Sequence, residues 1–363
     1  MTGARLPFEH SLAGKRVLVT GHTGFTGSWS CMWLKSIGAD VAGCALEPDT
    51  EPSLFRELSL DRGMTSAVID IREYQPLAAF FASFRPELVL HLAAQPLVRC
   101  GYREPMATFA TNTQGTVHVL EAARNTNSVK AVVCVTTDKV YQNREWSWPY
   151  RENDTIGASE PYGGSKAAAE MAIAAYRVAF GSTDGSGCAF AAARGGNIIG
   201  GGDWAEDRLI PDFVRAVVTG GRLTLRNPDA TRPWQHVLGL VQGYLMLLAS
   251  LREHPAAFAG SWNFGAHETR SFTVREVLEL LSSQWSRPDI EYVPSPLREA
   301  QMLALDSSEA RSRLGWNPPW DTRRAIAETA AWYRDFYCNR SLAEEITVRQ
   351  LESWRTDVHT LQQ

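Results

Sequence analysis

The sequence has no apolar stretch long enough to span a bilayer, and no basic segment followed by an apolar run near its N-terminus. A membrane-spanning helix needs about 20 apolar residues, and a secretory signal needs both of those segments, so we expect neither. Positive charge is not in excess, because 36 Lys and Arg stand against 40 Asp and Glu for a net charge of −4. We therefore expect no nucleic-acid partner and no membrane partner.

Cysteine is scarce, with six residues among 363. None of the six forms a C-x-x-C pair, and no histidine cluster has zinc-finger spacing, so the sequence predicts no metal site. Several cysteines lie in apolar runs, as Cys134 does between Ala131 and Val135. Buried free thiols are typical of proteins in a reducing compartment, which favours a cytoplasmic location.

The remaining composition is that of a globular protein, with 44% hydrophobic and 21% charged residues. This excludes the disordered and collagen-like classes. Short β-branched runs alternate with helical apolar patterns through the first half of the chain, which is typical of a doubly wound parallel α/β sheet of the Rossmann type. We expect strands at 15–20, 41–46, 67–71, 88–92, 131–136 and 189–194, and helices at 75–84, 106–124 and 162–180.

The regular alternation of predicted strands and helices ends after Asn197. A glycine run at 200–202 and the Asn227-Pro228 segment indicate loops, and short strands and helices are mixed from there to the end. We predict a Rossmann domain over 1–196. Residues 197–363 should form mainly a smaller, mixed lobe, with some segments returning to the first domain.

A glycine-rich turn links the first strand to the following helix. Gly21, Gly24 and Gly27 have the spacing GxxGxxG. A phosphate pair must approach backbone N–H groups at a helix N-terminus, and a Cβ atom would block that approach. Such a turn alone can be no more than a tight connection, but a strand before it and a helix after it favour a dinucleotide site.

The residues after the second and third strands bear on the type of dinucleotide. Glu47 is the first acid after the second strand, and it either binds the adenosine ribose or is an ordinary loop carboxylate. Asp70 and Ile71 end the third strand and could reach the adenine. No basic residue follows the second strand to hold a 2′-phosphate, so we prefer NAD to NADP.

Tyr162 and Lys166 lie one helical turn apart and therefore share a helix face. A free phenol has a pKa of about 10, and lowering it by about three units means favouring the phenolate by about 4 kcal/mol. A nearby lysine and a cationic nicotinamide supply the positive charge for that shift. A surface Tyr–Lys pair is the alternative, but its place after the fifth strand favours a catalytic pair.

The order of these motifs, together with His91-Leu92-Ala93-Ala94-Gln95 after the fourth strand, resembles the extended short-chain dehydrogenase/reductase family of nucleotide-sugar enzymes. The resemblance covers the chain from about Lys15 to Trp320. It implies that the first domain binds NAD and the second lobe a nucleotide sugar. The cofactor contacts it implies are Gly21, Thr23, Gly24, Phe25, Thr26, Gly27, Asp70, Ile71, Ala93, Ala94, Gln95, Thr136, Tyr162 and Lys166.

Thr137-Asp138-Lys139 at the end of the fifth strand narrows the resemblance to nucleotide-sugar 4,6-dehydratases. Lys139 stands where a Glu is usual, and this variant is similar to CDP-glucose 4,6-dehydratases. The same group is matched at 21–25, 52–55, 195–204, 208–212 and 231–237, whereas Gly163-Gly164 departs from its usual spacer. A solvated turn with an ion pair is the alternative interpretation of Asp138 and Lys139.

The resemblance implies an internal redox cycle in which a hydride passes from C4 of the hexose to NAD and then to C6, with net loss of water. Tyr162 would accept the 4-OH proton, Asp138 would protonate the departing 6-OH, and Thr137 would hydrogen-bond O4. Lys139 either removes the C5 proton or stabilises the enolate while another group or water takes that proton. These alternatives stay open.

The substrate contacts that the resemblance implies are Gln95, Asn197, Arg208, Arg232 and Arg298, since an arginine fork suits a diphosphate. A role in packing rather than in ligand contact is expected of three aromatic residues: Trp234, His236 and Trp262. Apolar residues on several faces of the helices at 106–124 and 162–180 favour a homodimer or higher homo-oligomer, unless those faces pack inside the monomer. A nucleotide-sugar 4-epimerase and a non-catalytic NAD-binding scaffold are the rival functions.

Overall fold

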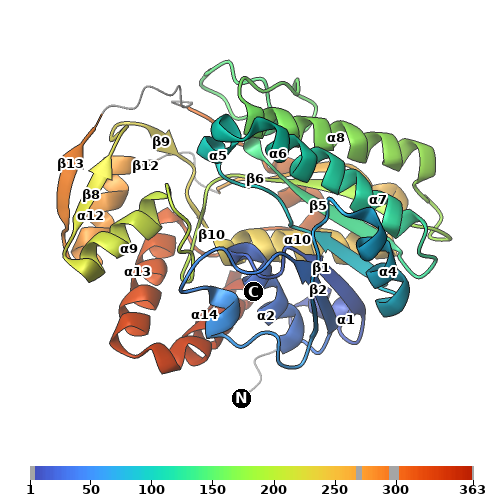
Figure 1. The fold of residues 1–363 in the computed structure, drawn as a ribbon, viewed down its shortest axis with the longest axis horizontal. Coiled ribbons are helices and arrows are strands. Elements are labelled where there is room, and N and C mark those ends of the chain that lie inside the picture. The colour runs from blue at the N-terminus through green and yellow to red at the C-terminus, as the bar shows by residue number, and fades with distance from the viewer. Residues whose placement is uncertain (1–4, 267–271, 294–301, 362–363) are drawn as a thin grey trace.

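A seven-stranded parallel sheet forms the centre of the computed structural model, which describes residues 5–266, 272–293 and 302–361 (Figure 1). The strand order is β11-β6-β5-β4-β1-β2-β3, and every neighbouring pair is parallel. The strands are β1 (Arg16–Thr20), β2 (Asp40–Ala45), β3 (Thr65–Val68), β4 (Leu88–His91), β5 (Ala131–Thr137), β6 (Ala189–Gly195) and β11 (Ser261–Phe264). The predicted fold class is confirmed.

Both faces of the sheet are covered by apolar packing, because successive strand side chains point to opposite faces. Val17 and Val19 of β1 join one hydrophobic core, and Leu18 joins the other. The first core holds α1 (Pro7–Leu12), α2 (Phe25–Ser36) and α10 (Val237–Glu253), and the second holds α4 (Tyr74–Phe84), α7 (Gly115–Arg124) and α8 (Pro161–Phe180). Most side chains of α10 are buried around its whole circumference.

The third strand begins and ends earlier than expected. It was predicted at 67–71 but runs over Thr65–Val68. The chain turns at Asp70, whose carboxylate accepts a hydrogen bond from the Arg72 amide at 2.9 Å and whose carbonyl accepts one from the Glu73 amide at 3.0 Å. The turn takes Asp70 and Ile71 out of the strand and places them beyond its carboxyl end.

The helix predicted at 106–124 is interrupted by one wide turn. It consists of α6 (Pro105–Phe109), a π-helical turn η1 (Ala110–Gln114) and α7. Such turns occur frequently at functional sites. Here the turn holds Asn112, whose amide bonds both the N–H and the C=O of Gln95, at 2.8 and 3.1 Å. The preceding short helix α5 covers Val98–Arg103.

The second half of the chain is divided between the central sheet and a smaller lobe. The edge strand β11 pairs with β6, and α10 packs beneath β5 and β6. The other strands form three two-stranded sheets, from β7 (Ile198–Ile199) with β10 (Gln235–His236), β9 (Thr231–Arg232) with β12 (Phe272–Thr273), and β8 (Arg222–Leu225) with β13 (Asp289–Tyr292). The exact domain division stays a prediction.

The remaining helical segments complete the lobe and the edges of the molecule. They are α3 (Leu54–Glu57), η2 (Asp138–Val140), α9 (Leu209–Thr219), α11 (Pro255–Phe258), α12 (Val274–Gln284), η3 (Ala310–Leu314), α13 (Thr322–Cys338), η4 (Arg340–Leu342) and α14 (Ala343–Leu361). Over the described ranges, no helix has both the length and the apolar character to cross a membrane.

The expectation of buried free thiols is confirmed. Cys31, Cys44, Cys134 and Cys188 are free and buried. Burial raises the pKa of Cys31 to about 12 and that of Cys44 to about 12, so these thiols stay protonated and are structural rather than reactive.

Candidate functional site

The glycine turn after β1 lies directly against the loop after β4. Gly21 has φ +75°, and a Cβ atom on it would be 2.6 Å from the Ala93 nitrogen. A Cβ atom on Gly27 would be 2.1 Å from the Gly21 oxygen. The helix α2 begins after Gly24 without a side-chain cap, so its first N–H groups are available to an anion. The turn therefore fits the pyrophosphate of a dinucleotide.

The residues expected at the adenosine end are already engaged in protein contacts. Glu47 is exposed and lies 3.5 Å from Arg56. The Arg72 guanidinium hydrogen-bonds Asp70 and holds the pKa of that carboxyl below its usual value. Ile71 is buried, and a Cβ atom on Gly115 would be 2.6 Å from its side chain. The cofactor roles of Asp70 and Ile71 stay predictions.

The loop after β4 is held by a buried histidine and by the π-helical turn. The His91 ring lies between the Thr20 and Thr116 hydroxyls, at 2.7 and 3.0 Å. Burial, reinforced by the charge of Lys166, lowers the pKa of His91 to about 3, so the ring is neutral. The Ala93 amide donates to Thr20 at 3.2 Å. This loop is therefore fixed beside the glycine turn.

Gln95 was predicted to contact cofactor and substrate, yet its amide is bonded inside the protein. The nitrogen donates to Thr108 at 2.9 Å, and the oxygen accepts from the Leu97 amide at 2.5 Å. Asn112, which sequence reasoning missed, ties the backbone of Gln95 to the Ser165 hydroxyl at 2.9 Å. Asn112 lies between Thr108 and Thr116 on one polar helix face, and nothing further in the sequence indicated its role.

Tyr162 and Lys166 occupy the first two turns of α8. The side chain of Glu160 caps this helix by accepting hydrogen bonds from the Tyr162 and Gly163 amides at 2.7 and 2.6 Å. Both residues of the pair are buried. Lys166 donates to the Val135 carbonyl at 3.0 Å rather than to the phenol. The residues thus share a helix face, as predicted, but the ammonium is anchored to β5.

Burial acts on both members of this pair and disfavours their charged forms. It raises the pKa of Tyr162 to about 12, against the opposing effects of the Thr137 hydrogen bond and the Arg208 charge. It also lowers the pKa of Lys166 to about 8. Near neutral pH the phenol of the ligand-free protein is therefore protonated, and its ionisation requires additional positive charge nearby.

Thr137, Asp138 and Lys139 meet the phenol at the carboxyl end of β5. The Thr137 hydroxyl donates to Asp138 at 3.0 Å and lies close enough to Tyr162 to oppose the rise in the pKa of the phenol. Asp138 is buried, and the Lys139 ammonium lies 3.7 Å from its carboxylate while remaining about one-third exposed. The structure thus brings the predicted proton donor and phenol together around one shared hydroxyl.

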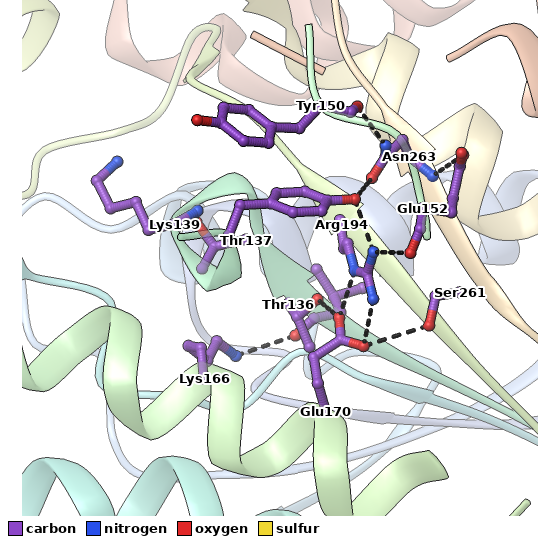
Figure 2. Close-up of polar contacts among 12 residues, drawn as sticks. Thr136, Thr137, Lys139, Tyr150, Glu152, Lys166, Glu170, Arg194, Ser261 and Asn263 are labelled. Atoms are coloured by element: carbon purple, nitrogen blue, oxygen red, sulfur yellow. Dashed lines mark hydrogen bonds and ion pairs between the residues drawn. The ribbon is translucent and has the colours of Figure 1, made fainter. Parts of the chain in front are cut away.

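A buried ion pair anchors α8 one turn beyond Lys166. Glu170 accepts two hydrogen bonds from Arg194 of β6, at 3.0 and 3.1 Å, and both side chains are only 2% exposed. Thr136 donates to the same carboxylate at 2.6 Å (Figure 2). Lys166 and Glu170 therefore bind two successive residues of β5, Val135 and Thr136. Thr136 was predicted to contact the cofactor, but its hydroxyl is directed to Glu170.

The ion pair continues into a network that reaches the edge strand and the connection after β5. The Arg194 guanidinium donates to the Tyr141 hydroxyl at 2.6 Å, and that hydroxyl donates to Asn263 at 2.8 Å (Figure 2). Arg194 also donates to the Glu152 carbonyl at 2.9 Å. Every strongly buried polar group in this network has a partner, as a stable buried network requires.

Three of the predicted substrate residues belong to segments that follow β6: Asn197, Arg208 and Arg232. Arg208 pairs with Asp203 at 2.9 Å, and its charge acts on Tyr162. Arg232 is half-buried on β9, and the Asn197 carbonyl accepts a hydrogen bond from the Gln235 amide at 3.1 Å. Arg298 lies outside the described residues. The packing role expected of three other aromatic residues is confirmed by their burial: Trp234, His236 and Trp262.

The sequence profile of the family described as GDP-mannose 4,6 dehydratase matches residues 18–329. The chain belongs to this family. Among curated relatives, it is 43% identical over 329 residues to CDP-glucose 4,6-dehydratase of Salmonella typhimurium, covering 88% of this chain and 91% of that protein. Both findings agree with the resemblance inferred from the motifs.

Solved structures share the fold over most of this chain's length. DesIV, a dTDP-glucose 4,6-dehydratase from Streptomyces venezuelae solved with NAD and TYD bound, has a TM-score of 0.76 at 25% identity, covering 91% of this chain and 99% of that one. UDP-glucose 4-epimerase of Thermus thermophilus in complex with NAD also has a TM-score of 0.76 at 25% identity, covering 88% and 99%. The family fold therefore serves both dehydratases and epimerases.

The buried ion pair makes a testable contribution to stability. Removing one partner, as in Glu170→Leu or Arg194→Met, leaves an uncompensated buried charge and should lower the free energy of unfolding by about 3–5 kcal/mol. The double variant should cost clearly less than the sum of the two single variants. Urea denaturation of the four proteins measures this coupling.

The exposed pair Arg349–Asp335, 2.6 Å apart, provides the matched control. When each of these two residues is replaced singly and then both together, the interaction energy between them should stay below about 1 kcal/mol. Additive effects at Glu170 and Arg194 would show that the two side chains do not depend on each other.

Proposed function

We propose that this protein catalyses the NAD-dependent dehydration of CDP-glucose to the 4-keto-6-deoxy sugar. The observation that carries the proposal is the grouping of Tyr162, Asp138 and Lys139 around the Thr137 hydroxyl at the carboxyl end of β5. An epimerase needs the phenol but has no hydroxyl to expel, whereas a dehydratase needs a buried acid beside it. The choice of CDP-glucose is supported by 43% identity to a CDP-glucose 4,6-dehydratase.

The residues fit NAD as the resident cofactor. The cradle formed by Gly21 and Gly27 has no room for Cβ atoms, and α2 offers its N-terminus to the pyrophosphate. Thr23, Phe25 and Thr26 belong to the same turn and first helical residues. When bound, NAD supplies a temporary acceptor for a hydride, so that the sugar undergoes no net oxidation.

Tyr162 would take the proton of the sugar 4-OH. Its pKa of about 12 in the ligand-free protein means that it becomes a base only when a cation lies nearby. Lys166, held at the Val135 carbonyl, would supply one such charge. Bound NAD would supply another through its cationic nicotinamide. Thr137 would hold the sugar O4 while the phenol accepts the proton.

In its carboxylic acid form, Asp138 would protonate the departing 6-OH and become a carboxylate. The Lys139 ammonium forms an ion pair with this side chain, 3.7 Å away. An ammonium stabilises the negative charge of an enolate but accepts no proton. We therefore prefer the enolate-stabilising role for Lys139, with another group or water removing the C5 proton.

Arg208, Arg232 and Asn197 would bind the nucleotide diphosphate from the lobe side, with Arg298 as a further candidate. Arg208 supports this placement because it lies close enough to the phenol for each to shift the pKa of the other. A guanidinium fork binds two phosphate oxygens at once.

Product analysis with CDP-, dTDP-, GDP- and UDP-hexoses tests the proposed function. We expect a 4-keto-6-deoxy sugar from CDP-glucose and much slower turnover of the others. Tyr162→Phe should lose more than about a thousandfold in kcat, because the proton acceptor is absent. A C4 epimer as product would favour the 4-epimerase, and bound NAD without any turnover would favour the non-catalytic scaffold.

The role of Lys139 can be separated from hydride transfer. Lys139→Met should slow water loss by about tenfold or more while leaving oxidation at C4 possible, because the ammonium acts after that step. Rapid-mixing absorbance should then show reduced nicotinamide accumulating before product appears. Unchanged turnover in this variant would remove Lys139 from the mechanism.

The pH dependence follows from the charge of Lys166. Its pKa is lowered to about 8, so the ammonium is present below that pH and is lost as the pH rises through it. Activity should therefore fall on the alkaline side of about pH 8. In Lys166→Arg the guanidinium stays charged, and this alkaline decrease should disappear even if the rate near neutral pH is lower. If the wild type and Lys166→Arg lose activity alike above about pH 8, the loss is due to titration of another group.

We also propose that the protein forms a homodimer through α6 and α8. Their outward faces carry exposed apolar side chains: Met106 (87%), Phe109 (41%), Met171 (55%), Val178 (83%) and Phe180 (50%). α6 and α8 pack on each other, and Figure 1 shows them along one side of the molecule. Exposed apolar patches of this kind are typical of interfaces. The mass in solution, measured by light scattering, decides between monomer and dimer.

A further inference from the structure

Three charged residues outside the predicted site join the sheet side of the molecule to the lobe. Arg226 donates to the Asp207 carboxylate at 2.9 Å, and Arg99 lies 3.6 Å from the same oxygen. Arg99 belongs to α5, which follows β4. Asp207 precedes α9, and Arg226 follows β8, so both belong to the lobe (Figure 1). Their side chains are 26–30% exposed and thus partly removed from water.

The two segments that carry Arg99 and Asp207 also reach Tyr162. Gly101, in the same short helix as Arg99, has no side chain, and a Cβ atom there would be 3.1 Å from the Tyr162 nitrogen. On the other side, Arg208 follows Asp207 directly, and its charge acts on the Tyr162 phenol. The ion pair between Arg99 and Asp207 therefore joins two segments that both lie near Tyr162, one packed on its backbone and one whose arginine acts on its phenol.

Asp207 and the nearby Asp203 differ in the hydrogen bonds and ion pairs that their carboxylates make. Asp203 is buried, accepts a hydrogen bond from the Ala205 amide at 3.1 Å and pairs with Arg208. The side-chain contacts of Asp207 within the described residues are with the two guanidiniums. Its backbone has φ +59°, a conformation that only Gly, Asn and Asp adopt readily. A single carboxylate at a left-handed turn thus pairs with two partly buried cations.

We propose that Arg99 and Arg226 bind the diphosphate of the nucleotide sugar, and that Asp207 holds both guanidiniums in place until the substrate displaces it. This inference rests on the proposed function, because a nucleotide sugar carries the anionic diphosphate that the pair would take. Two guanidiniums sharing one carboxylate leave an excess of positive charge, and a diphosphate matches that charge more fully than one carboxylate does. The arginines are positioned beforehand, which reduces the entropy lost on binding.

Exchange of the Asp207 carboxylate for a diphosphate couples the sheet side of the molecule to the lobe. In the ligand-free protein, Asp207 links Arg99 of α5 to the lobe through one ion pair. A bound diphosphate replaces that link by contacts from both sides to the substrate itself. Arg99 thereby becomes a substrate contact contributed by the sheet side, in addition to the arginines of the lobe.

Calorimetric titration of the NAD-loaded protein with CDP tests the proposal. CDP carries the diphosphate but has no hexose, so it is not turned over. Arg99→Gln should raise the Kd for CDP about tenfold, because a charge-assisted contact is lost, and Arg226→Gln should do the same. Cytidine, which has no phosphate, should bind the wild type and both variants alike. Wild-type CDP affinity in Arg99→Gln would overturn the proposal.

Asp207→Asn tests the competition directly. Asparagine tolerates the same left-handed backbone, so the turn is preserved while the competing charge is removed. The Kd for CDP should fall about threefold, in proportion to one partly screened ion pair. Asp335→Asn, which removes the charge from an exposed pair in the C-terminal helices, should leave the Kd unchanged. Weaker CDP binding in Asp207→Asn would show that Asp207 only supports the arginines.

Titrations with UDP, dTDP and GDP separate this proposal from the choice of substrate. If another nucleoside diphosphate binds best, the assignment of cytosine fails, but Arg99→Gln should still weaken binding of that nucleotide. If the wild type binds CDP well and Arg99→Gln binds it equally well, the proposed function stands and the anion site fails. Binding of none of the four would overturn both. Melting temperatures of all variants confirm that each protein is folded.

Discussion

The ion pair between Glu170 and Arg194 is the constraint on which the catalytic arrangement depends. Two charges that are almost fully removed from water are stable only if their geometry is fixed and their remaining hydrogen bonds are made. Here Thr136 and Tyr141 complete those bonds. Since Glu170 lies one turn beyond Lys166, the pair fixes the position of α8 along β5. The phenol of Tyr162 consequently faces Thr137 without relying on flexible surface contacts.

The same burial that orders this region keeps it chemically inactive until it is occupied. In the ligand-free protein it opposes ionisation of Tyr162 and weakens protonation of Lys166. A cationic nicotinamide beside the phenol would reverse the first effect, so the base is generated only when the cofactor is in place. Such an arrangement would couple proton abstraction to occupancy of the site.

Local patterns in the sequence were sufficient to predict the sheet, the glycine turn and the Tyr162–Lys166 pair, because each depends on residues close together along the chain. The strand ending at Val68 was misplaced, since the turn made by Asp70 was hidden in an apolar run. The partners of Arg194 could not be predicted, because a charged residue in a strand gives no indication of which distant carboxylate it meets. The same limit applies to Asn112 and to the contacts of Asp207.

The position of β11 has a consequence for how the chain is assembled. Within the first 196 residues, β6 has a single neighbour, β5, and its other edge is filled only when Ser261–Phe264 arrives from the second half. During synthesis, one edge of β6 therefore has unpaired backbone N–H and C=O groups until β11 has been made. Unpaired strand edges can pair with strands of other chains. A fragment that stops before Ser261 keeps that exposed edge permanently, so the cofactor half is poorly suited to an independent existence.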